Sequence, residues 1–91
     1  MKTIYKYHIP ILSEFQLRLP KDAVILAFQT QNGTPTIWAI IDTSSVEEER
    51  SFMLFGTGHP VPAEANLQYI GTTQQGLDPL SLVWHLFEKV K

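Results

Sequence analysis

The residues best suited to binding chemistry lie in one short stretch, "FGTGHPVP" at positions 55–62. Gly56 and Gly58 allow backbone N–H groups to point into one concavity, which is how anion-binding nests form. Thr57 adds a hydroxyl group, and His59 adds an imidazole ring that can donate a hydrogen bond. The same composition also suits a structural strand exit, with glycines in a bulge and prolines that stiffen the chain. The stretch therefore predicts either a binding loop or a turn.

The three histidines do not form a recognisable metal or catalytic pattern. His8, His59 and His85 are far apart in the sequence, and no carboxylate accompanies them at a known ligand spacing. A Ser-His-Asp site needs a nucleophile on a strained turn, and the sequence has no G-x-S-x-G motif. Asp42 follows an apolar run and is expected to cap a turn. We expect a non-enzymatic protein with no catalytic residue, no metal and no cofactor.

Composition narrows the class of protein further. The 91 residues suit one domain over 1–91, and the formal net charge of −2 comes with no Lys/Arg cluster, which argues against duplex nucleic acid as a partner. The absence of cysteine fits a reducing compartment. No apolar run approaches the roughly 20 residues of a membrane span, and the first residues do not read as a signal peptide. We expect a soluble, intracellular protein with no membrane contact.

Along most of the chain, apolar and polar side chains alternate with a period of two residues. This pattern is typical of half-buried β-strands. Strands are predicted over residues 3–11, 14–20, 24–31, 34–42, 50–56 and 66–74. The predicted fold is mainly β: a single small domain, built as a curled antiparallel sheet or small barrel of six or seven short strands, with at most one or two short helical turns. Such curvature buries the aromatic residues and leaves few edges exposed.

The clearest element is a hairpin around Asn32-Gly33, because both central residues of a type I′ turn need positive φ and this pair tolerates it best. The hairpin is predicted to join a strand over 24–31 to one over 34–42. Trp38 stands in "TIWAII", which is apolar on both faces. We expect this strand to be central and covered on both sides, with Trp38 deeply buried.

Two segments allow more than one structure. In "DTSSVEEER", Ser44 and Ser45 each precede a glutamate by three residues, so one helical turn with a capping box or a charged loop both fit, and the charges are expected to be solvated. The last segment, 80–91, fits either a helical stripe or a strand. Its aromatic and β-branched residues favour the strand.

Five pieces of the sequence together resemble a known family. They are "YKY" near the start, "LPKDAVILAFQTQNGTPTIWAIID", "EERSFMLFGTGHPVP", "YIGT" and "VWHLFE", and the resemblance runs from about residue 4 to about residue 88. The chain resembles a family of small phage and prophage proteins to which no function is assigned. This resemblance implies the cytoplasm of an infected bacterial host. It also implies an accessory role, typically against host defences.

What the resemblance implies about partners stays open between several classes. A counter-defence protein would bind either a small nucleotide-like ligand or a host bacterial protein. The alternatives are a virion structural or assembly component and, in third place, a small hydrolase. A homo-oligomer is compatible with each of them.

A candidate ligand site follows from combining the loop with nearby motifs of the same pattern. If His59 and His85 approach each other, with Tyr69, Trp84 and Phe55 beside them, they would line an aromatic, hydrogen-bonding pocket suited to a nucleobase. The predicted ligand-binding residues are therefore Gly56, Thr57, Gly58, His59, Tyr69, Trp84 and His85.

Overall fold

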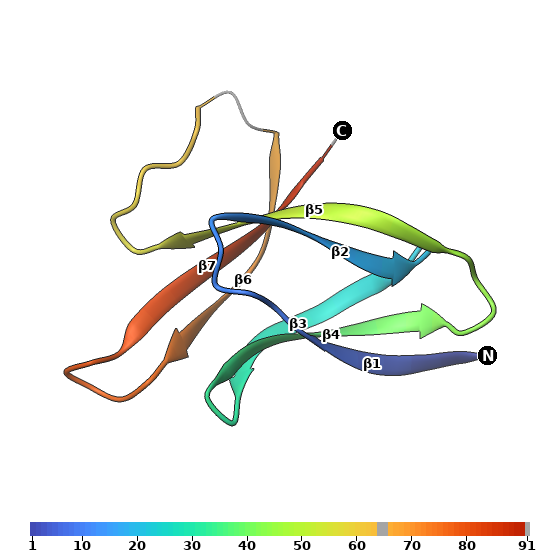
Figure 1. The fold of residues 1–91 in the computed structure, drawn as a ribbon, viewed down its shortest axis with the longest axis horizontal. Helices are drawn as coiled ribbons and strands as arrows, with labels where there is room; N and C mark the ends of the chain where they lie inside the picture. The colour runs from blue at the N-terminus through green and yellow to red at the C-terminus, as the bar shows by residue number, and fades with distance from the viewer. Residues whose placement is uncertain (64–65, 91) are drawn as a thin grey trace.

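The computed structural model describes residues 1–63 and 66–90, and within them it has seven strands and no helix (Figure 1). In chain order the strands are β1 (Lys2–His8), β2 (Glu14–Pro20), β3 (Val24–Gln31), β4 (Thr34–Asp42), β5 (Glu47–Gly56), β6 (Leu67–Gln75) and β7 (Leu82–Lys89). The predicted all-antiparallel β fold is confirmed. Residues 64 and 65 of the predicted connection after β5, and Lys91, lie outside the described residues.

The strands form two antiparallel sheets between which the chain passes repeatedly. The three-stranded sheet has the order β1-β4-β3, and the four-stranded sheet has the order β2-β5-β7-β6. The sheets meet where β3 runs beside β6, but no backbone ladder joins these two strands. The arrangement is therefore curled and not closed into a barrel.

Side-chain hydrogen bonds take the place of a ladder between β3 and β6. The hydroxyl of Thr30 donates to the carbonyl oxygen of Gln74 at 2.8 Å and shares a hydrogen bond with the Thr73 hydroxyl at 2.9 Å. Gly71 allows the strands to approach, because a Cβ there would lie 3.2 Å from the Cβ of Phe28. This junction positions β6, and with it one side of the candidate site.

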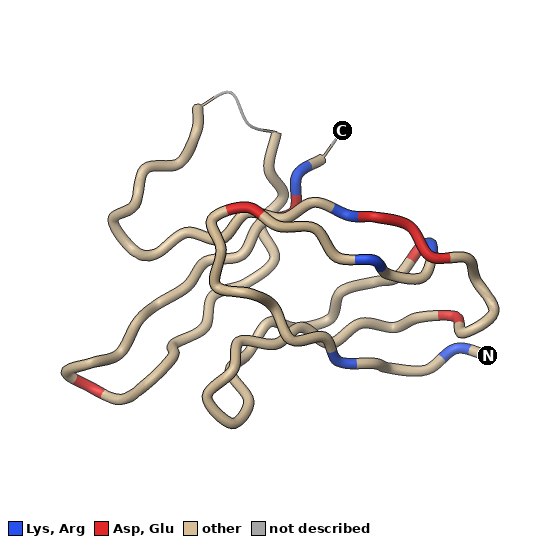
Figure 2. The backbone as a smooth tube through the Cα atoms, viewed as in Figure 1, with Lys and Arg blue, Asp and Glu red and all other residues tan. Residues whose placement is uncertain are grey.

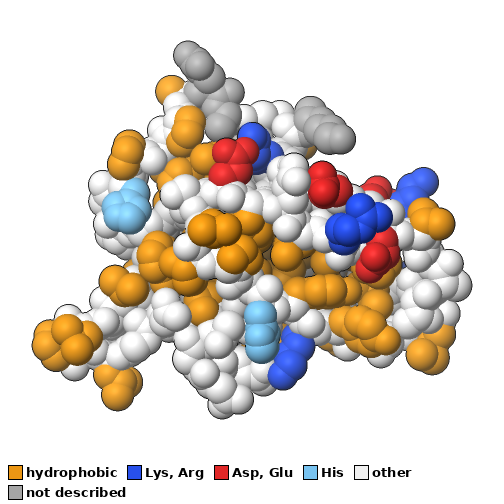
Figure 3. Space-filling view, viewed as in Figure 1, with side chains coloured by type: hydrophobic (Ala, Val, Ile, Leu, Met, Phe, Trp, Pro, Cys, Tyr) orange, Lys and Arg blue, Asp and Glu red, His pale blue; other side chains and the backbone are white. Residues whose placement is uncertain are grey.

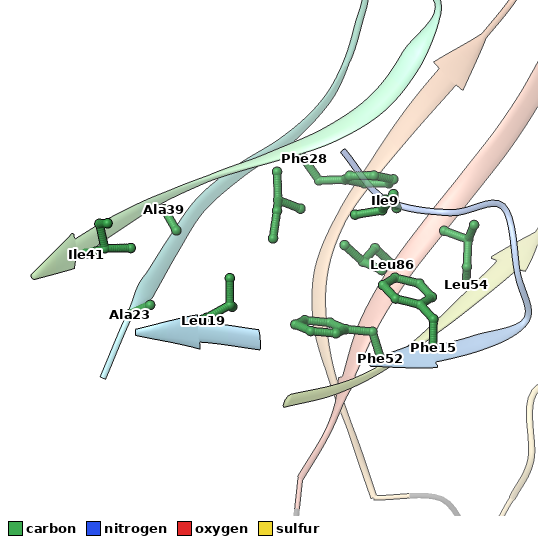
Figure 4. Close-up of a cluster of buried hydrophobic side chains, with 11 residues drawn as sticks. Ile9, Phe15, Leu19, Ala23, Phe28, Ala39, Ile41, Phe52, Leu54 and Leu86 are labelled. Atoms are coloured by element: carbon green, nitrogen blue, oxygen red, sulfur yellow. The ribbon is translucent and has the colours of Figure 1, made fainter. Parts of the chain in front are cut away.

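The hydrophobic core fills the space between the two sheets (Figure 4). Phe15 and Phe52 stack inside it with ring centroids 5.5 Å apart. Other core side chains alternate along the strands as the sequence pattern predicts. The core consists of Ile9, Phe15, Leu19, Ala23, Phe28, Ile37, Ala39, Ile41, Phe52, Leu54 and Leu86.

The predicted hairpin is confirmed with its bounds. Asn32 has a φ of 50° and Gly33 a φ of 80°, so both central residues lie in the left-handed region that a type I′ turn requires. β3 and β4 flank the turn, and Gln31 lies opposite Thr34.

The prediction that Trp38 is deeply buried is wrong. β4 is central in its sheet, but only the face that carries Ile37, Ala39 and Ile41 is buried in the core. Trp38 lies on the opposite face and is half-buried, because no other layer covers that side among the described residues. A run that is apolar on both faces thus does not require two covering layers.

The two ambiguous segments are resolved. The stretch after Asp42 contains a turn and no helical turn; the Asp42 carboxylate accepts hydrogen bonds from the amide and hydroxyl of Ser44, and caps the turn as predicted. β5 then begins at Glu47, so the charged run belongs to a strand. The last segment is the strand β7, as favoured.

Candidate functional site

Three neighbouring strands place the candidate residues on the outer face of the four-stranded sheet. Leu54 of β5 lies opposite Leu86 of β7, and both point into the core. Because side chains alternate along a strand, Phe55 and its partner His85 point away from the core. His85 also lies opposite Thr72 of β6.

A chain of four hydrogen-bonded side chains crosses this outer face. His85 Nε2 lies 2.8 Å from the Thr57 hydroxyl, and His85 Nδ1 lies 2.9 Å from the Thr72 hydroxyl. The Thr72 hydroxyl in turn lies 2.6 Å from the Tyr69 hydroxyl. We call Thr57, His85, Thr72 and Tyr69 the His85 chain. Both ring nitrogens are engaged, so the orientation of the imidazole is fixed from two sides.

Aromatic rings flank the His85 chain. Phe87 makes edge contacts with Phe55 at 5.6 Å and with Tyr69 at 5.4 Å between ring centroids. Tyr69 therefore belongs to both groups: its ring packs on Phe87 and its hydroxyl ends the His85 chain. Edge-to-face contacts of this kind add roughly 0.5–1.5 kcal/mol beyond area burial. They hold the Tyr69 ring in place although that side chain is exposed.

The hydrogen bonds of the His85 chain have no fixed direction. A neutral imidazole has one donor and one acceptor nitrogen, and each hydroxyl can donate or accept. The chain can therefore run in either direction, so its terminal hydroxyls on Thr57 and Tyr69 can present a donor or an acceptor to a partner. In a hydrolase triad the second ring nitrogen faces a carboxylate, which stabilises the imidazolium. Here it faces the Thr72 hydroxyl.

The other predicted residues lie on the opposite face of the sheet. Gly56 lies opposite Trp84, and a Cβ at Gly56 would lie 2.8 Å from the His59 ring, so these three share the core-facing side. Trp84 donates from Nε1 to Gln75 Oε1 at 2.9 Å. A small cavity of about 130 Å³ opens here, lined by Ile11, Leu12, Ser13, Leu54, His59 and Trp84. The structure does not bring His59 and His85 together on one face.

One of the two glycine amides predicted for an anion-binding nest is engaged within the loop. The Gly56 amide donates to His59 Nδ1 at 3.1 Å, and the His59 amide donates to the Gly56 carbonyl oxygen at 3.0 Å. The Thr57 amide donates to the Val83 carbonyl oxygen at 3.3 Å. Gly58 has a φ of 88° and is the left-handed residue of this turn. The loop is thus a turn held partly by its own hydrogen bonds, and the Thr57 side chain extends from it to His85.

Thr72 is a site residue that the sequence reasoning missed. Strict alternation from Tyr69 would point Thr72 into the core. A bulge between Tyr69 and Gly71 shifts the register, so Thr72 joins Tyr69 on the outer face. The available signal was Gly71 itself, because a glycine inside a strand pattern often marks a bulge.

A second polar group was also missed, in an open depression of about 820 Å³ at the other end of the sheet. Arg50 forms a two-point ion pair with Glu88, at 2.6 Å from Nε and 2.7 Å from Nη2, and its Nη1 donates to the Ala23 carbonyl oxygen at 2.6 Å. The hydrogen bond to Glu88 is the largest effect on the Arg50 guanidinium and raises its pKa above the usual value. The expectation of a solvated charged run is therefore wrong for Arg50.

Within residues 1–63 and 66–90, no three His, Asp or Glu side chains are grouped so as to hold a metal ion. No helix of the described chain has the length and apolarity to cross a membrane.

The fold is a small, curled, all-antiparallel β domain whose outer face carries the exposed hydroxyl groups of Thr57, Tyr69 and Thr72. The chain belongs to a family described as a domain of unknown function, DUF7352, whose model matches residues 1–91. Neither the curated proteins nor the solved structures contain a match to the chain.

Proposed function

We propose that this protein is a non-enzymatic binding protein that engages a protein partner through the outer face of its four-stranded sheet. The observation that carries the proposal is the His85 chain, an exposed row of hydroxyl and imidazole groups held rigid beside the Phe87 and Tyr69 rings. Tyrosine is enriched at protein interfaces and at their hot spots, because it combines a large apolar area with a polar tip.

Shape favours a protein partner over a captured nucleotide. Ligand pockets for small molecules usually measure about 300–1,000 Å³ and enclose most of the ligand. The cavity beside Trp84 and His59 is about 130 Å³, and the larger depression of about 820 Å³ around Arg50 is open and contains no residue of the His85 chain. A nucleotide-like ligand remains the second candidate, because the exposed Tyr69 ring and the hydroxyl groups around it would suit a base.

The biological setting rests on the sequence resemblance. Small phage and prophage proteins often act against host defences, so we propose that the partner is a bacterial host protein and that binding takes place in the cytoplasm of the infected cell. A virion structural or assembly role is the competing function. Proteomics of purified particles separates them: the counter-defence role expects the protein in cells and not in particles.

Native mass spectrometry of the protein isolated from bacterial cells tests the binding mode. Wild type should carry the added mass of a protein. Thr72→Val breaks the His85 chain at its centre with little change in shape, and Tyr69→Phe removes only the terminal hydroxyl. Both should lose the added mass and keep the wild-type melting temperature to within a few degrees, whereas Thr43→Val in the β4–β5 turn should retain it. An added mass of nucleotide size would favour the second candidate. Retention of a protein partner by both variants would refute the proposed surface.

A further inference from the structure

One strand edge on the other sheet is unused. β1 pairs with β4 along one side only, and in the described chain no strand pairs with its other side. Figure 1 shows β1 along the lower border of the molecule. Free backbone N–H and C=O groups on such an edge can accept another strand.

Each face of the three-stranded sheet leaves a large side chain exposed at this edge. Ile4 and Tyr5 are consecutive residues that point to opposite faces, yet Ile4 is 55% exposed and Tyr5 is 50% exposed. On the outer face Ile4 continues an apolar row that runs from Val24 through Ile40. The row stops at the edge. A strand added beside β1 would cover Ile4 on one face and Tyr5 on the other.

The charge of β1 selects what can pair with it. Lys2, Lys6 and His8 share the outer face with Ile4, and Figure 2 shows basic but no acidic residues along the strand. Lys6 donates only to the neutral Gln31 Oε1, at 2.7 Å. Asp42 lies opposite Lys2, but its Oδ1 already accepts hydrogen bonds from Ser44 and forms an ion pair with the Met1 amino group at 3.0 Å.

Self-pairing conflicts with this charge pattern. In a symmetric antiparallel pair of β1 strands, side chains that lie opposite each other share a face, so a register that places Lys2 opposite Lys6, or Lys6 opposite Lys6, brings like charges together. Like charges directly opposite are destabilising. The acidic run Glu47–Glu49 of the same chain belongs to the other sheet, where its backbone is already paired with β2.

We propose that β1 is a docking edge for an extended, acidic segment of a partner protein. The segment adds a fourth strand to the three-stranded sheet, with carboxylates opposite Lys2 and Lys6 and apolar side chains opposite Ile4 and Tyr5. Main-chain hydrogen bonds supply affinity and the alternating side chains supply selectivity, as in other cases of strand addition. This edge is separate from the His85 chain, so it goes beyond the proposed function.

The probe is a synthetic peptide, Thr-Glu-Tyr-Val-Thr-Glu with serine flanks, titrated into the full chain while backbone amide shifts are followed by NMR. The shifts should be confined to β1 and its neighbour β4. Lys6→Glu should weaken binding roughly two- to tenfold, since one favourable cross-strand charge pair becomes a repulsive one. Lys21→Glu, in the exposed β2–β3 turn, is the matched control and should bind as wild type does.

A charge-reversed peptide with lysine in place of glutamate should prefer the Lys6→Glu variant over wild type. Absent shifts, shifts outside β1 and β4, or equal binding by wild type and Lys6→Glu would each overturn the proposal. So would concentration-dependent dimerisation with amide protection on β1, because that result assigns the edge to a second copy.

Discussion

Replacing Arg50 tests how the open end of the core is held. Arg50 lies on the core-facing side of β5, two residues before the buried Phe52. Its side chain is 19% exposed and that of Glu88 is 18% exposed, so both charges are largely removed from water. The guanidinium joins β5 to β7 through Glu88 and to the β2–β3 turn through the Ala23 carbonyl oxygen. Arg50→Met keeps an unbranched apolar stem and removes all three hydrogen bonds.

The expected loss follows from this burial. Removing one partner of a fully buried pair costs about 3–5 kcal/mol, and hydrogen bonds to charged groups contribute about 1.5–3 kcal/mol each. Because water still reaches this pair, we expect Arg50→Met to lower the free energy of unfolding by about 2–4 kcal/mol. For a domain of this size that corresponds to a fall in melting temperature of roughly 10–25 °C. Chemical denaturation and calorimetry measure both quantities.

The next residue after Glu88 provides the matched control. Lys89 forms an ion pair with Glu14 at 2.7 Å, but the two side chains are 43% and 55% exposed. Such surface pairs contribute about 0–1 kcal/mol, so Lys89→Met should change little. The double variant Arg50→Met, Glu88→Leu should be more stable than Arg50→Met alone, since it leaves no unpaired carboxylate. If Arg50→Met and Lys89→Met lost equal stability, the Arg50 pair would be screened by solvent and the reasoning above would be wrong.

Three smaller predictions test other parts of the fold. Gly33→Val should lower the denaturation midpoint by the equivalent of about 1 kcal/mol or more, because a β-branched residue is strained at a φ of 80° although the space around it is open. Trp38→Ala should cost less than the roughly 3–5 kcal/mol of a buried aromatic, since Trp38 is half-buried; a loss in that range would show that the outer face is covered in solution. Hydrogen bonds from Ser44 hold the pKa of Asp42 well below its usual range, so this group stabilises the fold above about pH 4 and loses that effect as the pH falls further; Asp42→Asn should reduce the acid dependence of the melting temperature.

Local patterns were sufficient for most of the fold. Alternation placed the strands, and Asn32-Gly33 placed the hairpin with its bounds, because both signals are set by neighbouring residues. The Arg50–Glu88 pair could not be foreseen in the same way. Arg50 stands in a charged run typical of a surface, and its burial depends on how β7 and the β2–β3 turn close over it. Contacts between segments that are far apart in the sequence are not indicated by the residues next to Arg50.

The strand predicted for the last segment already limits which residues can share one site. A strand over the last segment already requires Trp84 and His85 to point to opposite faces, because successive side chains alternate. A pocket that includes both is therefore incompatible with the strand that was favoured there. Applied to the whole segment, the same alternation would have placed the His85 side chain on the face of the sheet that points away from the core.

The bulge in β6 is the step that alternation alone does not supply. It moves Thr72 to the face of Tyr69 and so completes the link from His85 to the Tyr69 hydroxyl. The bulge is followed by Gly71, whose lack of a side chain lets Phe28 of β3 approach. Gly71 therefore adjoins both the junction of the two sheets and the bulge that completes the His85 chain, so the position of that chain depends on the curvature of the fold.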